Sequence, residues 1–171
     1  MYIKSWIKLL GQIVVVVIVW NYVPHHITVF DWPVPPILTF GALLVWVIII
    51  INAFNLIDGL DGLASGLAIV SSVCMAVWFL LIRGHWSEAM CMLILAAACL
   101  GFLRYNFYPA KIFLGDTGST FLGLIFAITG LSAVDKVVTV TSLLLPVLVI
   151  GVPLFDVVLA IWPASSALPE K

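Results

Sequence analysis

The chain has 171 residues, of which 64% are hydrophobic and only 9% are charged, and this composition excludes a water-soluble globular protein. A formal net charge of -1, with no long basic block, argues against a nucleic-acid partner. The three cysteines lie within apolar stretches and lack metal-binding or redox spacing. We therefore predict a membrane protein whose few polar residues indicate its function.

Apolar runs along the chain predict an all-α polytopic membrane protein with about six transmembrane helices. The expected spans are 7–23, 37–54, 67–82, 89–103, 121–134 and 137–161. The fifth is short for a straight crossing, and Pro146, Gly151 and Pro153 predict a kink or break in the last. The start, with Lys4 and Lys8 before a valine-rich run, also resembles a signal peptide, but no small-residue cleavage site follows it.

Basic residues predict the orientation, because lysine and arginine accumulate in short cytoplasmic loops. With the N-terminus inside, the inner side holds Lys4, Lys8, Arg104, Lys111 and Lys171, and the outer side holds Arg83 and Lys136. This excess favours an N-in, C-in arrangement. Two polar, glycine-containing segments, 55–66 and 104–120, then lie on the cytoplasmic face as the predicted active-site loops.

The segment 104–120 has the chemistry of a phosphate cradle. Gly115 and Gly118 permit backbone angles closed to other residues, and Asp116 supplies an anionic oxygen. Thr117 and Ser119 add hydroxyl groups just before the next apolar run. Magnesium takes few protein ligands and retains waters and substrate phosphate oxygens, so one or two carboxylates would suffice. The alternative is an ordinary turn that caps the following helix, where Asp, Thr and Ser are common.

The segment 55–66 also has two interpretations. Asn55, Asp58 and Asp61 have i, i+3, i+6 spacing, which on a helix places them on one face. Such a face could bind a nucleotide base or ribose, whereas the two Asp-Gly pairs are also typical of turns. Both segments lie on one predicted membrane face, with Asp156 near the inner end of the last span. This shared location favours a functional site.

Three motifs in the chain resemble those of a known family. They read Asn-Ala-Phe-Asn-Leu-Ile-Asp-Gly-Leu-Asp-Gly-Leu-Ala-Ser-Gly at 52–66, Asn-Phe-Tyr-Pro-Ala-Lys-Ile-Phe-Leu-Gly-Asp-Thr-Gly-Ser at 106–119 and Gly-Val-Pro-Leu-Phe-Asp at 151–156. They are similar to the signatures of the polyprenyl-phosphate N-acetylhexosamine-1-phosphate transferases, in glycosyltransferase family 4. The residues of these motifs are most similar to those of the undecaprenyl-phosphate N-acetylglucosamine-1-phosphate transferase branch. The resemblance implies that 1–162 form part of the family's transmembrane core. The tail 163–171 resembles nothing in the family, and the C-in arrangement predicts that it is a short cytoplasmic tail.

This resemblance implies a reaction in the bacterial inner (plasma) membrane. The phosphate of undecaprenyl phosphate attacks the β-phosphorus of a UDP-N-acetylhexosamine, with N-acetylglucosamine as the expected sugar. Magnesium, or manganese as the alternative, bridges the pyrophosphate. The products are a lipid-linked sugar diphosphate, which would start a cell-envelope polysaccharide, and UMP.

The resemblance also implies roles for individual residues. Asp116 would be the metal ligand, and Asp58 and Asp61 would join it as catalytic residues. Asn55 and Asp58 would order the nucleotide diphosphate, and Asp61 would lie near the uridine. Lys111 would neighbour a phosphate. The implied substrate-binding set is Asn55, Asp58, Asp61, Lys111, Gly115, Thr117, Gly118 and Ser119.

The chain departs from the family pattern at both ends. It lacks the family's Asp-Asp motif and its basic, histidine-containing loop, so we expect a chain truncated at both ends. A homodimer or a second chain would complete the site; a catalytically incomplete fragment or a non-catalytic membrane subunit is the alternative. A third hypothesis is an ion or proton pathway through Asp58, Asp61, Asp116 and Asp156. It is less favoured because transport sites usually lie near the bilayer midplane.

Overall fold

The computed structural model describes residues 5–22, 28–29 and 32–132. Their elements, in chain order, are α1 (Ser5–Trp20), β1 (Thr28–Val29), β2 (Trp32–Pro33), α2 (Pro36–Ile57), α3 (Leu63–Trp78), a π-helical turn η1 (Phe79–Arg83), α4 (Trp86–Asn106) and α5 (Gly115–Ser132). The strands β1 and β2 have two residues each and pair antiparallel, with Thr28 opposite Pro33. The described part of the chain is therefore almost entirely helical.

Five of the six predicted spans coincide with helices: α1, α2, α3 with η1, α4 and α5. By length and composition, three described helical segments can cross a membrane, namely Pro36–Ile57, Leu63–Leu81 and Trp86–Asn106. The segment Trp6–Trp20 is apolar but shorter. These helices confirm the helical, membrane-type architecture. The sixth predicted span, Asp156 and the expected tail lie outside the described residues, so six spans and the N-in, C-in orientation stay predictions.

Proline and glycine set the starts of two of the long helices. Helix α2 begins at Pro36, where the fixed φ of proline suits the first helical turn and its missing N–H removes no helical hydrogen bond. Gly62 precedes α3 with φ +75°, a left-handed angle that side chains disfavour. The short connection between α2 and α3 therefore turns sharply and keeps these two helix ends together.

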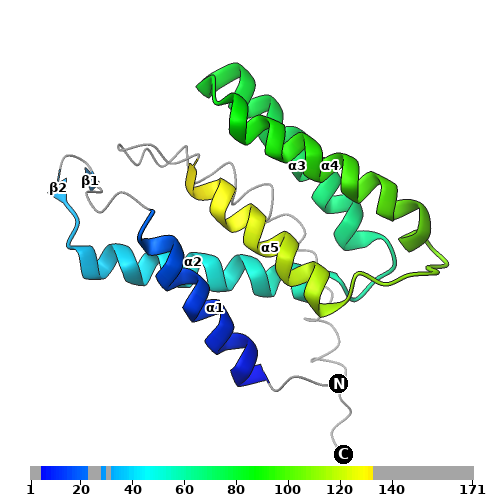
Figure 1. The fold of residues 1–171 in the computed structure, drawn as a ribbon, viewed down its shortest axis with the longest axis horizontal. Coiled ribbons are helices and arrows are strands. Elements are labelled where there is room, and N and C mark those ends of the chain that lie inside the picture. Colours follow the sequence, from blue (N-terminus) through cyan, green and yellow to red (C-terminus); the bar gives the residue numbers. More distant parts are fainter. Residues whose placement is uncertain (1–4, 23–27, 30–31, 133–171) are drawn as a thin grey trace, which may run out of the picture.

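Two helix pairs form the frame that carries the site. Helix α3 packs along α4, helix α2 packs along α5, and α1 lies against α2 (Figure 1). Between α2 and α5, the rings of Phe54 and Phe126 stack with centroids 5.0 Å apart, and both side chains are buried. The indole Nε1–H of Trp46 donates to the carbonyl oxygen of Ala127 at 3.0 Å. This bond satisfies a polar group that would be costly to leave unpaired in an apolar interior.

The backbones of α2 and α5 approach each other closely at Gly123. A Cβ atom at this position would lie 2.6 Å from the Cα atom of Ile51 and 3.1 Å from the carbonyl oxygen of Ile50. Both neighbours are backbone atoms, so neither could move aside as a flexible side chain could. Small residues that allow such an approach are typical of helix interfaces in membranes.

We expect Gly123→Ala to push α2 and α5 apart and to lower the free energy of unfolding by about 1–3 kcal/mol, the usual cost of overpacking. Gly101→Ala in α4 is the matched control, because a Cβ atom there would meet no atom within 4 Å. Thermal unfolding in detergent should show a lower midpoint for Gly123→Ala alone. Equal midpoints for the two variants would contradict the close packing.

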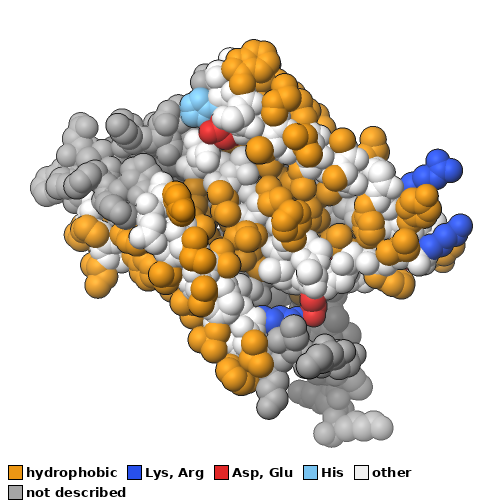
Figure 2. Space-filling model, in the orientation of Figure 1, with side chains coloured by type: hydrophobic (Ala, Val, Ile, Leu, Met, Phe, Trp, Pro, Cys, Tyr) orange, Lys and Arg blue, Asp and Glu red, His pale blue; other side chains and the backbone are white. Residues whose placement is uncertain are grey.

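The outer faces of the helices are apolar. Large exposed hydrophobic side chains occur on each long helix, among them Val14, Ile49, Val70, Ile94 and Phe121. Figure 2 shows hydrophobic side chains over much of the visible face, with a few charged side chains at the upper left, at the right edge and in the lower middle. Such a largely apolar surface matches the hydrocarbon of a bilayer better than it matches water.

Candidate functional site

The polar segments of the sequence meet at one end of the helices. Here α2 leads into α3, and α4 leads into α5. One hydrogen bond joins these connections: the Ala110 N–H donates to Asp61 Oδ2 at 3.0 Å. A second joins the adjacent helix ends, where the Ser65 hydroxyl of α3 donates to Asn106 Oδ1 of α4 at 2.8 Å. The structure thus brings the segments 55–66 and 104–120 together, although about 40 residues of helical hairpin separate them in sequence.

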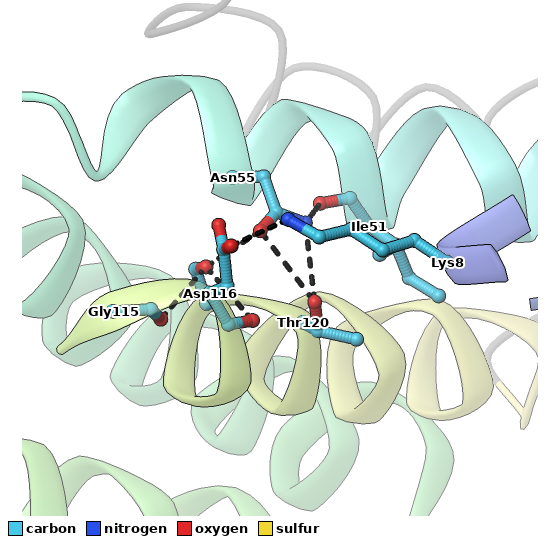
Figure 3. A network of polar contacts seen from close by, with 7 residues as sticks. Lys8, Ile51, Asn55, Gly115, Asp116 and Thr120 are labelled. Atoms are coloured by element: carbon cyan, nitrogen blue, oxygen red, sulfur yellow. Dashed lines mark hydrogen bonds and ion pairs between the residues drawn. The ribbon is translucent and has the colours of Figure 1, made fainter. Parts of the chain in front are cut away.

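Asp116 lies in the first turn of α5, and 72% of its side chain is exposed. Its Oδ2 atom accepts a hydrogen bond from Lys8 Nζ at 2.5 Å, in an ion pair that joins α5 to α1 (Figure 3). The partial positive charge at a helix N-terminus stabilises a carboxylate there. This contact was not predicted, because no local sequence pattern signals a pairing between residues 108 positions apart.

Asn55 links α2 to α5 through both ends of its amide group. Its Oδ1 atom accepts a hydrogen bond from the Ser119 hydroxyl at 2.8 Å, and its Nδ2 atom donates to Thr120 Oγ1 at 3.3 Å. Within α2, the same Nδ2 atom donates to the carbonyl oxygen of Ile51 at 2.8 Å (Figure 3). The side chains of Asn55 and the buried Ser119 therefore form hydrogen bonds within the protein. Their roles in substrate binding stay predictions.

Asp58 caps the C-terminal end of α2 and also contacts the start of α5. Burial raises the pKa of its carboxyl group above the ordinary value. A hydrogen bond from the backbone N–H of Gly115 lowers this pKa, whereas the negative charge of Asp116 raises it, and the net shift is upward. The two carboxylates therefore repel each other, and a cation beside them would relieve that repulsion.

The prediction that Asn55, Asp58 and Asp61 share one face of a helix is wrong. Asn55 lies within α2, but the helix ends at Ile57, and Asp61 lies in the turn that follows. The alternative interpretation, turns at the Asp-Gly pairs, describes the observed backbone. The chain nevertheless places the two carboxylates at the same end of the structure, since the turn folds back against the connection between α4 and α5.

A buried polar link holds the connection between α4 and α5. Asn106 is only 3% exposed, and its Nδ2 atom donates to the carbonyl oxygen of Ile112 at 2.9 Å while its Oδ1 atom accepts from Ser65. The N–H of Lys111 donates to the carbonyl oxygen of Tyr105 at 2.8 Å. Asn106 belongs to the motif at 106–119, but no role was predicted for it. The signal that could have found this link is the presence of polar residues where apolar helices end.

The other predicted site residues lie on the solvent-accessible surface at this end of the helices. Lys111, Gly115 and Thr117 are exposed, and Gly118 is partly exposed. Gly115 has φ +67° at the point where the loop enters α5. The segment from Gly115 onward is also the first turn of α5, so the helix-start interpretation describes its backbone correctly. A phosphate cradle at the same place stays a prediction.

Among the residues that the structure describes, no three His, Cys, Asp or Glu side chains gather as a metal-binding group. Magnesium does not require such a group, because it binds through one or two carboxylates and completes its shell with water and phosphate oxygens. The exposed carboxylate of Asp116, with Asp58 close by, has the chemistry for this type of site. In this structure the cation beside Asp116 is the Lys8 ammonium group. The donor set therefore fits magnesium or manganese, with Asp116 as the residue to hold it.

The family model of glycosyl transferase family 4 matches residues 1–134, which contain every helix and strand of the described part. The chain belongs to glycosyl transferase family 4. This match confirms the family that the motifs at 52–66 and 106–119 indicate. The motif at 151–156 lies beyond both the matched region and the described residues.

Several curated relatives of this family-4 chain are transferases by name. A probable undecaprenyl-phosphate N-acetylglucosaminyl 1-phosphate transferase of Bacillus subtilis is 48% identical over 118 residues, which cover 69% of this chain and 33% of the relative. The decaprenyl-phosphate N-acetylglucosaminephosphotransferase of Mycobacterium tuberculosis is 38% identical over 136 residues, 69% of this chain and 34% of the relative. A phospho-N-acetylmuramoyl-pentapeptide-transferase of Clostridioides difficile is 41% identical over 102 residues, 60% of this chain and 30% of the relative. The chain thus spans about a third of the length of these relatives.

Proposed function

We propose that this family-4 chain forms the core of a polyprenyl-phosphate sugar-1-phosphate transferase. The reaction would transfer N-acetylglucosamine-1-phosphate from UDP-N-acetylglucosamine to undecaprenyl phosphate and release UMP. The proposed location is the bacterial inner membrane, and the product would start a cell-envelope polysaccharide. Membership of the family supports this proposal, as do relatives named for transfer to undecaprenyl or decaprenyl phosphate.

The observation that carries the proposal is the exposed carboxylate of Asp116, next to Asp58, at the start of α5. Phosphoryl transfer depends mainly on charge neutralisation and on alignment of the attacking and leaving oxygens. Magnesium, when bound, would neutralise charge on the diphosphate. Asp116 would hold this ion, and Asp58, which lies against the backbone of Gly115, would help to keep the start of α5 in place.

Other groups at this end would bind the two substrates. The first turn of α5, which includes Gly115, Thr117 and Gly118, presents a helix N-terminus, where N–H groups and the helix dipole favour phosphate. Lys111, exposed on the preceding loop, would add a positive charge for a phosphate group. Asp61, on the adjacent turn, would bind the uridine.

The complete site is proposed to contain more than the residues described here, because the chain spans about a third of its relatives. The additional groups would come from elsewhere in the polypeptide, from a second copy of the chain or from another membrane protein. The described part would then supply the metal ligand and the start of the phosphate-binding helix. The alternative is that this chain has no transfer activity without such a partner, which the assay of the chain alone would show.

A chimera tests the proposal in a protein of the relatives' full length. The matched part of this chain would replace the 118 matched residues in the Bacillus subtilis relative. Membranes with this chimera should move labelled N-acetylglucosamine-1-phosphate from UDP-N-acetylglucosamine to undecaprenyl phosphate and release UMP. The 171-residue chain alone, in the same assay, shows whether it needs further residues. A chimera that inserts and folds but transfers no label would contradict the proposed function.

The proposed orientation predicts which positions a reagent can reach from each side. Lys111 should face the cytoplasm, and Ser87, at the opposite end of α4, should face outward. Each would be changed to cysteine in a chain whose own three cysteines have been replaced by alanine. In inside-out vesicles, a membrane-impermeant maleimide should label Lys111→Cys and leave Ser87→Cys unlabelled. The reverse pattern would show that the orientation is wrong.

A further inference from the structure

We infer that Lys8 is a positioning residue that serves as the internal counter-ion of Asp116 and gives way to the metal ion when that ion binds. The inference rests on the proposed function, because it takes Asp116 as the metal ligand. In the absence of metal, the Lys8 ammonium group neutralises a carboxylate that lies beside a second acid. Binding of the metal would exchange one cation for another at the same oxygen atom.

The packing of α1 sets the position of Lys8. Its Nζ atom lies 2.5 Å from Asp116 Oδ2, and 37% of the lysine side chain is exposed. One helical turn further along α1, the buried Gln12 accepts a hydrogen bond through Oε1 from Asn52 Nδ2 at 3.4 Å. This polar contact joins α1 to α2. It favours the position of α1 along α2 that places Lys8 beside Asp116.

The charges around Asp116 favour such an exchange. Lys8 brings one positive charge to a place where the negative charges of Asp58 and Asp116 repel each other. A divalent metal ion would bring two positive charges to the same place. The ammonium group and the metal ion compete for Asp116 Oδ2, because the two cations repel each other at such short range. Binding of the ion at this oxygen would therefore move Lys8 away from it.

Competition with Lys8 should weaken the binding of bare metal. Exposed ion pairs contribute little in water, so the effect would be modest rather than prohibitive. A metal that arrives with a nucleotide diphosphate has additional phosphate-oxygen ligands to hold it. The site would then favour metal that is already bound to the diphosphate over free metal.

Manganese binding to the purified 171-residue chain tests this inference. Electron paramagnetic resonance of free Mn²⁺ would report the bound fraction without any requirement for activity. We expect Lys8→Gln to bind Mn²⁺ about two- to fivefold more tightly than the unmodified chain, in line with the small contribution of an exposed ion pair. Lys8→Arg, which keeps the charge, should bind as the unmodified chain does. Unchanged or weaker binding by Lys8→Gln would overturn the inference.

Two further variants separate a local from a general effect. Arg83→Gln removes one positive charge from η1, at the end of α3 away from the site, and should leave Mn²⁺ affinity unchanged. Equal tightening by Arg83→Gln and Lys8→Gln would mean that net charge, rather than the Lys8 contact, controls the affinity. Circular dichroism and gel filtration would confirm that all variants are folded.

Asp116→Asn distinguishes failure of this inference from failure of the proposed function. If Asp116→Asn binds Mn²⁺ as well as the unmodified chain, Asp116 is not the metal ligand, and both proposals about this residue fail. If Asp116→Asn loses binding but Lys8→Gln gains none, the metal site stands and the counter-ion role of Lys8 is wrong. Loss of Mn²⁺ binding in Asp116→Asn, together with tighter binding in Lys8→Gln, would support both the metal site and the counter-ion role of Lys8.

Discussion

Replacing Asp116 with asparagine should reduce sugar-phosphate transfer by the chimera about a hundred- to a thousandfold, the range seen when an enzyme loses one group that stabilises transition-state charge. Asparagine has nearly the same size as aspartate and can still accept a hydrogen bond from Lys8. The change therefore removes the negative charge and leaves the packing of α5 largely as it was. Initial rates of lipid-linked label formation, at saturating magnesium, would measure the loss.

Glu88→Gln is the matched control for Asp116→Asn. It makes the same carboxylate-to-amide change in the first turn of another helix, α4, at the end away from the site. We expect this variant to keep nearly all of the transfer activity. If the chimera with Asp116→Asn kept more than a tenth of its activity, the assignment of Asp116 as the metal ligand would be wrong.

Asn106→Ala should lower the free energy of unfolding by about 1–3 kcal/mol, because it leaves the buried Ser65 hydroxyl without its acceptor. The Ser65 hydroxyl would lose its acceptor, and the Ile112 carbonyl would lose its donor. Ser65 and Asn106 are buried, whereas Ile112 is half exposed. The connection between α4 and α5 should loosen before the helices themselves unfold.

Hydrogen exchange measured by mass spectrometry would detect this loosening. We expect faster exchange for the amide of Lys111, which donates to Tyr105 within this connection, and little change within α2. Asn21→Ala is the control, since the Asn21 amide also donates to a backbone carbonyl, that of Val17 at 2.9 Å, but at an exposed position. Equal stability of the Asn106 and Asn21 variants would show that the buried link does not hold this connection.

The helices could be predicted because an apolar run long enough to cross a bilayer is a local property of the chain. The predicted spans 37–54 and 89–103 lie inside α2 and α4. Helix α5 begins at Gly115, well before the predicted start of its span, because its first turns are helical but polar. Hydropathy reports which residues suit lipid, and it does not report where a helix continues beyond the apolar region.

The site could be predicted in part. The motifs around Asp58 and Asp116 correctly indicated the residues that the structure places close together, and the family match confirms the origin of those motifs. The i, i+3, i+6 spacing failed because it assumes a continuous helix, and the Asp-Gly pairs after Ile57 end that helix instead. Spacing predicts a shared face only where the backbone remains helical.

The sequence by itself determined the membrane character of the protein, the positions of its described helices and the family to which it belongs, because each depends on short stretches of residues. Only the tertiary structure decided that Lys8 pairs with Asp116, that Asn55 joins α2 to α5, and that Ser65 supports Asn106. These contacts connect positions 41 to 108 residues apart. Their formation depends on how whole helices pack, which the residues near each contact do not specify.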